Sequence, residues 1–293
     1  MKMVVQICPV GAGDKQNAVL DQLAAAAQRL GHCVDRWNVK DLPHKIPVAD
    51  VVVFWNGMYN WASKIRKENE GQRFLFAELG WLPQEPCWQL DHAGPNAMSS
   101  WARDFLAVGA DVPAPQPKGD FLVVLQDDAD TQIYSSYLSP MFRRMVEFLA
   151  FLGNRIDVSL RVRDHPAHPC SLEARAMVES CGVMRWDESS SLVAALGDAA
   201  ALLTINSSCG VKALEMGIPL LSFGRSVWTS VAGASYCIFG EADPEMALKK
   251  AVEEIMRGRN SLNKVAQQAA LGRIMSKQWW PEQLPERLAW ALR

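Results

Sequence analysis

The chain has 293 residues, enough for two domains of ordinary size. Hydrophobic residues make up 49% of it and charged residues 21%, a globular composition, and the net charge of −2 gives no overall attraction to nucleic acid. No apolar run approaches the length of about 18 residues that spans a bilayer. Seven scattered cysteines without CxxC spacing favour a reduced, cytoplasmic protein.

The first third of the sequence alternates apolar runs with helix-like segments. Apolar runs predict strands at residues 3–9, 33–39, 50–55 and 73–77. Helical periodicity predicts a helix over residues 19–30 that ends at Gly31, and a polar helix over residues 61–69. Because strands that alternate with helices form parallel sheets, this part predicts a doubly wound α/β lobe.

A second α/β series follows a stretch with three prolines at residues 112–119, which predicts a linker. Strands are predicted at residues 120–125, 157–162, 200–205 and 219–223. Helices are predicted between and after them, at residues 139–151, 171–181, 191–196, 210–216 and 244–257. Residues 262–293 favour helix, with a break near Trp279-Trp280-Pro281.

The two series together predict an α/β protein of two Rossmann-like doubly wound lobes with a cleft between them. Residues 1–115 would form the acceptor-side lobe, and residues 118–265 the nucleotide-sugar lobe. Residues 266–293 would form a helical tail that packs back on the first lobe.

Polar motifs follow two predicted strands of the second lobe, at the strand ends where open α/β sheets bind ligands. After one strand come Arg163 and His165-Pro166, and the proline holds the histidine in an extended conformation, from which its ring can donate to a phosphate. After another come Asn206-Ser207-Ser208 at a helix start, where amides and hydroxyls suit a phosphate, and Gly210 would let a ligand approach. Taken singly, a surface turn and an ordinary helix cap are the commoner explanations.

Carboxylates follow two further predicted strands. The segment from Gln126 to Gln132 contains Asp127, Asp128 and Asp130, and such clusters persist at surfaces, metal sites or acid/base sites. A magnesium site and a solvated loop both remain open here. Glu78 follows the last strand predicted in the first lobe, from where it would face the cleft.

Two other motifs are too incomplete to assign, and two common ones are absent. Gly11-Ala12-Gly13 is too short for a dinucleotide fingerprint. His165, His168 and Cys170 lack a fourth ligand, so we expect no zinc site at these three residues. The sequence contains neither a GxSxG elbow nor a P-loop.

In their order and spacing these motifs resemble those of capsular polysaccharide biosynthesis proteins that transfer Kdo, a 3-deoxy-ulosonic acid, from CMP-Kdo. The resemblance runs from about Phe54 to Gly224. It rests on an E-x-G segment (Glu78-Leu79-Gly80), a D-x-x-G segment ahead of a serine pair (Asp91 to Gly94, Ser99-Ser100), Q-x-x-x-D-x-[SQ]-I (Gln126 to Ile133), basic-x-His-Pro (Arg163 to Pro166) and S-[ST]-x-G-x-x-A-L before G-x-P (Ser207 to Leu214, Gly217 to Pro219).

Two further points bear on the donor. The His-Pro and Ser-Ser motifs also look like the CMP-binding motifs of bacterial sialyltransferases, which favours a CMP-linked sugar. This sequence departs from the family at Lys212, where a glutamate is usual; Glu215, one helical turn further on, could take the place beside a ribose hydroxyl.

The resemblance implies a GT-B-like glycosyltransferase that moves Kdo from CMP-Kdo to a bacterial surface glycan, of capsule or lipopolysaccharide, with retention of configuration. It implies that Asp130 is the nucleophile and Glu78 the acid/base. The nucleotide and phosphate would contact Arg163, His165, Pro166, Asn206, Ser207, Ser208, Gly210 and Glu215. Further donor or acceptor contacts would come from Gln126, Asp128, Gln132 and Lys212.

No cofactor is required on this interpretation, because CMP is already a fair leaving group. The expected partners are the sugar nucleotide and a glycan acceptor, with peripheral association at the inner face of the inner membrane. Asp127 and Asp128 would raise the pKa of Asp130, so we expect a compensating cation or hydrogen bond there.

Three alternatives stay open from the sequence. The first is an inverting transferase of the sialyltransferase type, with an aspartate as base. The second is a two-lobed transferase or epimerase that uses a UDP-sugar. The third is a non-catalytic protein that binds sugar nucleotides.

Overall fold

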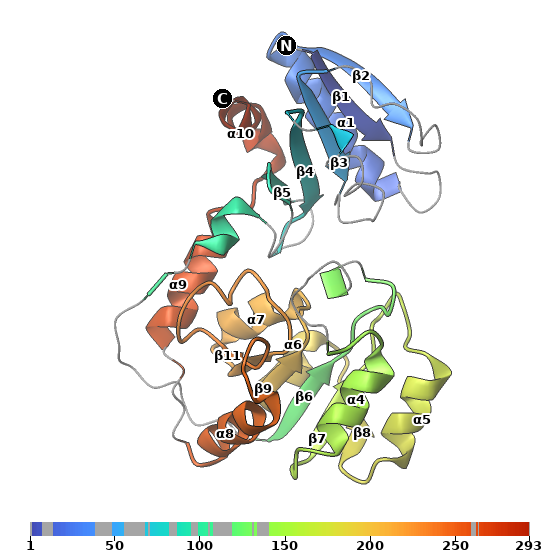
Figure 1. Cartoon of the computed structure of the whole chain (residues 1–293), viewed down its shortest axis with the longest axis vertical. Helices are drawn as coiled ribbons and strands as arrows, with labels where there is room; N and C mark the ends of the chain where they lie inside the picture. Colours follow the sequence, from blue (N-terminus) through green and yellow to red (C-terminus); the bar gives the residue numbers. More distant parts are fainter. Residues whose placement is uncertain are drawn as a thin grey trace. The chain divides into compact units, whose positions relative to one another are not determined.

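The computed structural model describes residues 2–7, 14–38, 49–55, 68–69, 71–81, 87–94, 99–104, 106–107, 119–130, 132–133, 141–258, 262 and 264–292. The Gly11-Ala12-Gly13 motif, most of the helix expected at residues 61–69 and the linker at residues 112–118 lie outside these ranges. The chain folds as two compact units. Unit 1 is Met1–Asp104 with Ile274–Arg293, and unit 2 is Phe105–Arg273 (Figure 1).

Unit 1 contains a sheet in the order β2-β1-β3-β4-β5. The strands are β1 (Lys2–Ile7), β2 (Cys33–Asn38), β3 (Val51–Trp55), β4 (Arg73–Leu79) and β5 (Trp88–Asp91). The first four are parallel, as the sequence predicts. The fifth is antiparallel to β4 and was not predicted, because four residues of mixed polarity give too weak a strand signal.

The core of unit 1 lies between one face of this sheet and two helices. The first helix, α1 (Asp14–Arg29), buries Leu20 and Leu23 against the sheet, and Gly31 follows it with a left-handed φ of 79°. The second, α10 (Leu284–Ala291), adds Leu288 to the same core and contacts α1. Burying one leucine contributes about 1.5–3 kcal/mol, so the last helix is a stabilising part of unit 1.

A short backbone pairing also ties the end of the chain to unit 1. Trp88 of β5 and Trp279 exchange hydrogen bonds, N to O, of 2.9 and 2.8 Å. The 3-10 helix η4 (Pro281–Gln283) follows directly, at the break the sequence predicts, and leads into α10.

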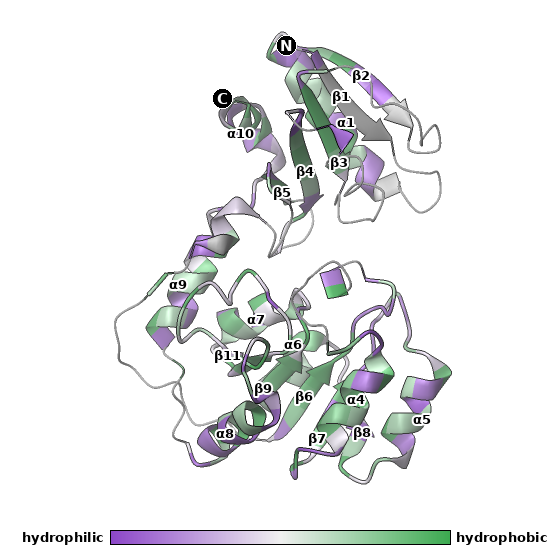
Figure 2. Cartoon of the chain, in the orientation of Figure 1, coloured by the Kyte–Doolittle hydropathy of each residue, from purple (hydrophilic) through white to green (hydrophobic). Residues whose placement is uncertain are grey.

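Unit 2 contains a fully parallel sheet in the order β11-β10-β9-β6-β7-β8. The strands are β6 (Asp120–Val124), β7 (Leu160–Arg163), β8 (Met184–Trp186), β9 (Ala199–Thr204), β10 (Leu220–Ser222) and β11 (Tyr236–Cys237). This is the Rossmann order, in which the chain changes direction across the sheet between the two central strands β6 and β9. Both central strands are buried and hydrophobic (Figure 2).

Helices cover both faces of the unit 2 sheet, as a doubly wound fold requires. On one face the buried cluster joins the strands to α4 (Met145–Gly153), α5 (Leu172–Ser180) and α8 (Pro244–Met256). Two further helices, α6 (Leu192–Gly197) and α7 (Cys209–Met216), contact β9 and each other. The two short edge strands β8 and β11 were not predicted.

The start of α4 differs from the prediction. The sequence predicts a helix over residues 139–151, whereas the helix begins at Met145. The backbone N–H of Met145 donates to Oδ1 of Asp128 at 2.6 Å, and Arg144 before it is extended. A carboxylate from a distant loop therefore caps the helix, a contact that local periodicity does not contain.

The unit boundaries also fall at other places than expected, at Asp104 and Ile274 instead of near residues 115 and 266. The N–H of Leu106 donates to the carbonyl of Ser230 at 2.8 Å. The chain therefore joins unit 2 before residue 115, where the boundary was expected. Helix α9 (Lys264–Met275) begins in unit 2, where Gln267 donates to the carbonyl of Ile218 at 3.2 Å. Among the helices within the ranges given above, none is long and apolar enough to cross a bilayer.

Candidate active site

The two central strands of unit 2 are joined just past their ends by a pair of amide side chains. Gln126 follows β6 and Asn206 follows β9, and both are buried. Nε2 of Gln126 donates to Oδ1 of Asn206 at 2.8 Å, and the backbone N–H of Asn206 donates to Oε1 of Gln126 at 2.9 Å. This pair marks the switch point of the sheet, where doubly wound folds bind their ligands.

The carboxylate of Asp130 is hydrogen-bonded to Gln126 of this pair. Nε2 of Gln126 donates to its Oδ2 at 3.1 Å, and the backbone N–H of Gln132 donates to its Oδ1 at 2.8 Å. Burial raises the pKa of Asp130 above its ordinary value, although these two hydrogen bonds oppose the shift. The compensating hydrogen bonds expected from the sequence are therefore present, but burial is the larger cause of the raised pKa.

The other two aspartates of the segment have separate partners. Asp128 caps α4, and Oδ1 of Asp127 accepts the backbone N–H of Ala129 at 2.9 Å. Oδ2 of Asp127 lies 3.5 Å from Nδ1 of His168. Within the part of the chain that the structure describes, no three His, Cys, Asp or Glu side chains are grouped to hold a metal ion.

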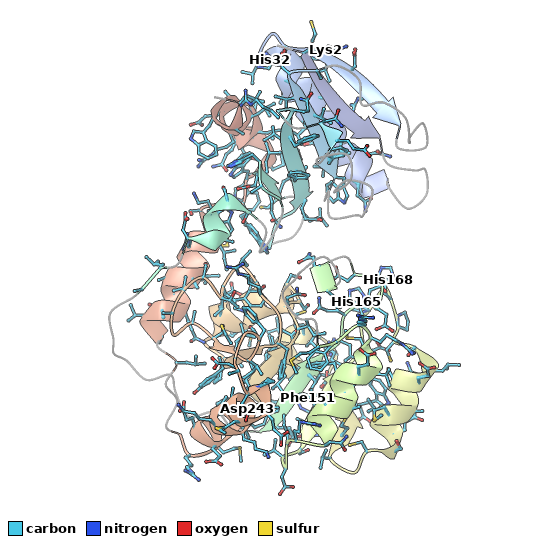
Figure 3. The ribbon with its side chains drawn as sticks, in the orientation of Figure 1. Lys2, His32, Phe151, His165, His168 and Asp243 are labelled. Atoms are coloured by element: carbon cyan, nitrogen blue, oxygen red, sulfur yellow. The ribbon has the colours of Figure 1, made fainter. Side chains whose placement is uncertain are left out.

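His165 follows β7 and lies beside His168, with ring centroids 5.1 Å apart (Figure 3). Its Nδ1 accepts the backbone N–H groups of Ala167 and His168, at 3.3 and 3.0 Å. An acceptor at Nδ1 assigns the proton of the neutral ring to Nε2. Burial, with the charge of His168, lowers the pKa of His165, so the ring is a neutral donor through Nε2 at neutral pH.

Arg163 precedes His165 and is held by an acidic residue that the sequence analysis did not single out. Its guanidinium donates to Asp187 at 2.6 Å and to the carbonyl of Ser189 at 3.0 Å. Arg161 donates to the same carboxylate at 3.1 Å. Asp187 follows β8, a strand of three residues with an arginine at its centre, so the sequence carried too little strand pattern to mark this position.

The Asp187 side chain is fully buried, and its pKa is affected in two directions. Burial alone would raise it, but hydrogen bonds from Ser189 and Arg163 and the charges of the two arginines hold it below its ordinary value. Two guanidinium groups share this carboxylate, and Arg161 also lies 4.0 Å from Oδ2 of Asp120. The charge of Arg163 reaches Cys209, the first residue of α7, and lowers its pKa against a larger increase from burial.

The start of α7 is ordered by the serine and threonine hydroxyls before it. Oγ of Ser207 accepts the N–H of Cys209 at 3.3 Å, and Oγ1 of Thr204 accepts the N–H of Ser207 at 3.2 Å. Ser208 occupies the N-cap position without a capping hydrogen bond from its side chain. The positive end of the helix dipole and the charge of Arg163 therefore act on the same helix start.

Gly210 has a packing role that differs from the one expected. A Cβ at this position would lie 2.5 Å from the ring of Trp228, which is fully buried. The Trp228 Nε1 donates to Oγ of Ser222 at 2.7 Å, which fixes the ring in place. An indole ring inside the protein is thus sufficient reason for a glycine at this position.

Four other residues of unit 2 were predicted to contact the donor or the acceptor: Gln132, Pro166, Lys212 and Glu215. Lys212 and Glu215 form an ion pair with each other along α7. The backbone carbonyl of Gln132 accepts Nδ2 of Asn206 at 3.3 Å, so Gln132 contributes through its backbone. Pro166 is exposed beside His165.

Glu78 lies in unit 1, inside β4 and not after it. It is paired with Gln89 of β5, and its Oε1 accepts the backbone N–H of Leu79 at 2.9 Å. The structure thus brings Asp130, His165, Arg163 and Asn206 to one edge of the unit 2 sheet, whereas Glu78 belongs to the other sheet.

The fold has known counterparts. The chain has a GT-B-like α/β fold, as the sequence predicts, with two Rossmann-like units. It is similar to the β-Kdo 2,7 transferase of Thermosulfurimonas dismutans KpsC, with a TM-score of 0.50 and 14% sequence identity over 88% of this chain and 100% of that chain. The resemblance seen in the motifs therefore extends to the fold.

Two further structures are similar at lower scores. The β-Kdo 2,4 transferase of the same KpsC has a TM-score of 0.48 and 15% identity, over 76% of this chain and 80% of that chain. A glycosyltransferase from Rickettsia africae has a TM-score of 0.45 and 10% identity, over 99% and 97%. No protein-family model and no curated protein sequence matches the chain.

Proposed function

We propose that the chain is a glycosyltransferase that moves a sugar, Kdo, from CMP-Kdo to a bacterial surface glycan. The observation that carries the proposal is the half-buried Asp130 carboxylate at the switch point of unit 2, near the neutral donor His165. A retaining transferase needs a nucleophile and a donor that stabilises the leaving group at one place, and perturbed pKa values are typical of active sites. The GT-B-like fold and the motif resemblance support the same class.

The groups around α7 suit the leaving nucleotide. As the bond to CMP breaks, negative charge collects on the phosphate. The Nε2–H of His165 and the hydroxyls of Ser207 and Ser208 are the proposed donors for that charge, and the positive end of the α7 dipole adds to their effect. The guanidinium of Arg163, whose charge reaches the first residue of α7, adds to the attraction. No metal ion is required for this step.

Asp130 is the proposed nucleophile of a retaining reaction. A carboxylate oxygen of Asp130 bonds to the anomeric carbon while the bond between that carbon and the CMP oxygen breaks. The electron pair of the broken bond leaves with CMP. In the second step an acceptor hydroxyl displaces Asp130 and gives its proton to a base. Glu78 is the proposed base, on the resemblance of its E-x-G segment.

The contacts of Gln126 and Asn206 favour a different role from the direct substrate contacts first expected of these two residues. Their polar groups are used to hold each other, Asp130 and Gln132, so we propose that they position the nucleophile. Donor contacts would then come from the more exposed groups around them.

The test of the nucleophile is mass spectrometry of the protein after mixing with CMP-Kdo. An adduct heavier by one sugar residue on a peptide containing Asp130 is expected, and Asp130→Asn should lose both the adduct and transfer while CMP still binds. Full transfer by Asp130→Asn would refute the assignment. Transfer that needs Asp130 but forms no adduct would favour the inverting alternative, for which a carboxyl of raised pKa suits a general base.

The nucleotide and the class of protein are tested separately. A thermal-shift comparison should show stabilisation by CMP above UDP and GDP, because a ligand bound only to the folded state raises Tm. Preference for UDP would replace the donor by a UDP-sugar. Hydrolysis of the donor without acceptor would exclude a protein that only binds sugar nucleotides.

A further inference from the structure

The sheet of unit 1 carries a groove at the end opposite to Glu78. Two pockets, of about 540 and 530 Å³, lie at the starts of β3 and β4, and one of them extends to the end of β5. They share Gln72 and Arg73, so they adjoin and form one elongated depression, here called the β4 groove. Glu78 lies near the other end of β4, so the groove is separate from that residue's surroundings.

An exposed indole ring lines one part of the groove. Trp290, on the last turn of α10, is 60% exposed and lines the larger pocket. Leu284 and Leu288 of the same helix are buried in the core, so they hold the helix and the indole ring is not needed for that purpose. An exposed indole at a pocket offers a flat apolar face together with an N–H donor.

Planar polar groups lie around this ring and are held in place. A guanidinium nitrogen of Arg73 donates to the carbonyl of Leu292 at 3.0 Å, at the end of α10, and Nε2 of Gln72 donates to the Arg73 carbonyl at 3.1 Å. Asp91 accepts the N–H groups of Ala93 and Ser100 at 2.7 and 2.9 Å. Fixed planar groups beside an aromatic face match a sugar ring, whose C–H face is apolar and whose edge carries hydroxyls.

The charges of the groove favour an uncharged ligand. The carboxylates of Asp50 and Asp91 and the guanidinium of Arg73 line it, which leaves one negative charge when His92 is neutral. A phosphate or a polyanionic chain would meet this negative charge without a surplus of cations. The two adjoining pockets, of about 540 and 530 Å³, together leave room for more than one sugar ring.

We propose that the β4 groove binds a short run of uncharged pyranose sugars, with one ring stacked on Trp290 and hydroxyls bound by Gln72 and Arg73. Resting on the proposed function, this run is the part of the glycan acceptor that lies away from the reacting hydroxyl. Binding of such a remote part lowers the free energy of the transition state for transfer when the whole substrate is held.

The test is isothermal titration of the full chain, without nucleotide, with cellohexaose, maltohexaose and chitohexaose. At least one of the three should bind, and Trp290→Ala should weaken that binding about tenfold or more, equal to about 1.4 kcal/mol. Trp280→Ala is the matched control, because Trp280 is also exposed but does not line the groove. Trp290→Phe should keep part of the affinity because it keeps an aromatic face.

Two outcomes overturn the proposal: none of the three sugars binds, or Trp290→Ala binds as well as Trp280→Ala. A melting curve for each variant shows that unit 1 remains folded. Asp130→Asn should bind the sugar like the unsubstituted chain. If transfer is never detected but sugar binding depends on Trp290, the proposed function fails while the groove proposal stands.

Discussion

Gln126 and Asn206 are joined by two hydrogen bonds, and each residue donates one of them. Nε2 of Gln126 donates to Oδ1 of Asn206 at 2.8 Å, and the backbone N–H of Asn206 donates to Oε1 of Gln126 at 2.9 Å. The amide of Gln126 therefore has only one satisfactory orientation, since turning it over would set its NH₂ group against the Asn206 N–H. In that orientation the same Nε2 also donates to Asp130. The packing of two central strands thus fixes a donor on the candidate nucleophile.

The first prediction concerns the pH dependence of transfer in Gln126→Glu. Asp130 acts as a carboxylate, so activity falls as pH drops through its pKa, which burial already raises. Glutamate at position 126 removes the Nε2 donor and adds a like charge, which raises that pKa further. The acidic limb of kcat/KM should move to higher pH by about one unit or more.

The control for this variant is Gln132→Ala, which keeps the backbone N–H that binds Asp130. Its acidic limb should stay where it is in the unsubstituted protein. An unchanged limb in Gln126→Glu would contradict the positioning role of the Gln126 amide.

The second prediction separates the two nitrogens of His165. In His165→Asn, the side-chain oxygen takes the place of Nδ1 and can still accept the N–H groups of Ala167 and His168, but the Nε2–H donor is lost. We expect Tm to change by only about 3 °C, while CMP affinity falls about tenfold or more, as for a lost hydrogen bond to a charged group.

Calorimetry and equilibrium binding measure the two quantities. His168→Asn is the matched control, because its ring pairs with Asp127 at the surface, and its CMP affinity should change less than about threefold. Equal losses in both variants would show that Nε2 of His165 is not the donor.

The third prediction tests the packing explanation for Gly210. A methyl group in Gly210→Ala would meet the Trp228 ring, so we expect a loss of about 1–3 kcal/mol in the free energy of unfolding. Trp228→Phe removes the ring atoms nearest to that methyl group. The double variant should therefore be more stable than the sum of the two single losses predicts, measured by urea unfolding. If the losses of the two single variants simply add in the double variant, contact with the Trp228 ring is not the reason for glycine at position 210.

The fourth prediction concerns Asp187→Asn, which leaves Arg161 and Arg163 without their shared carboxylate. Breaking a buried ion pair costs about 3–5 kcal/mol at neutral pH. Because the pKa of Asp187 is lowered in the folded state, its contribution is present above its unfolded pKa and is lost as pH falls through the lowered value.

The Tm difference between Asp187→Asn and the unsubstituted protein should thus be large at pH 7 and shrink in acid. Asp157→Asn, at an exposed position before β7, should change the free energy of unfolding by less than about 0.5 kcal/mol. A difference that persists unchanged in strong acid would contradict an ionised Asp187.

Much of the fold could be predicted because it is encoded locally. The run of buried residues in β9, the periodicity of α1 and the break before Pro281 are properties of short windows of sequence. The short strands β5, β8 and β11 were missed, because two to four residues carry too little pattern. The start of α4 was misplaced because its cap, Asp128, comes from a loop 17 residues earlier.

For the part of the candidate site in unit 2, the sequence by itself determined that Gln126, His165 and Asn206 follow strands, and parallel pairing then requires those strand ends to meet at one edge. Only the tertiary structure decided what each group does there. Asp130 is raised in pKa by burial, Arg163 is held by Asp187, and Gly210 makes room for Trp228. Burial, ion pairing and close packing depend on residues far apart in the chain, so no local pattern contains them.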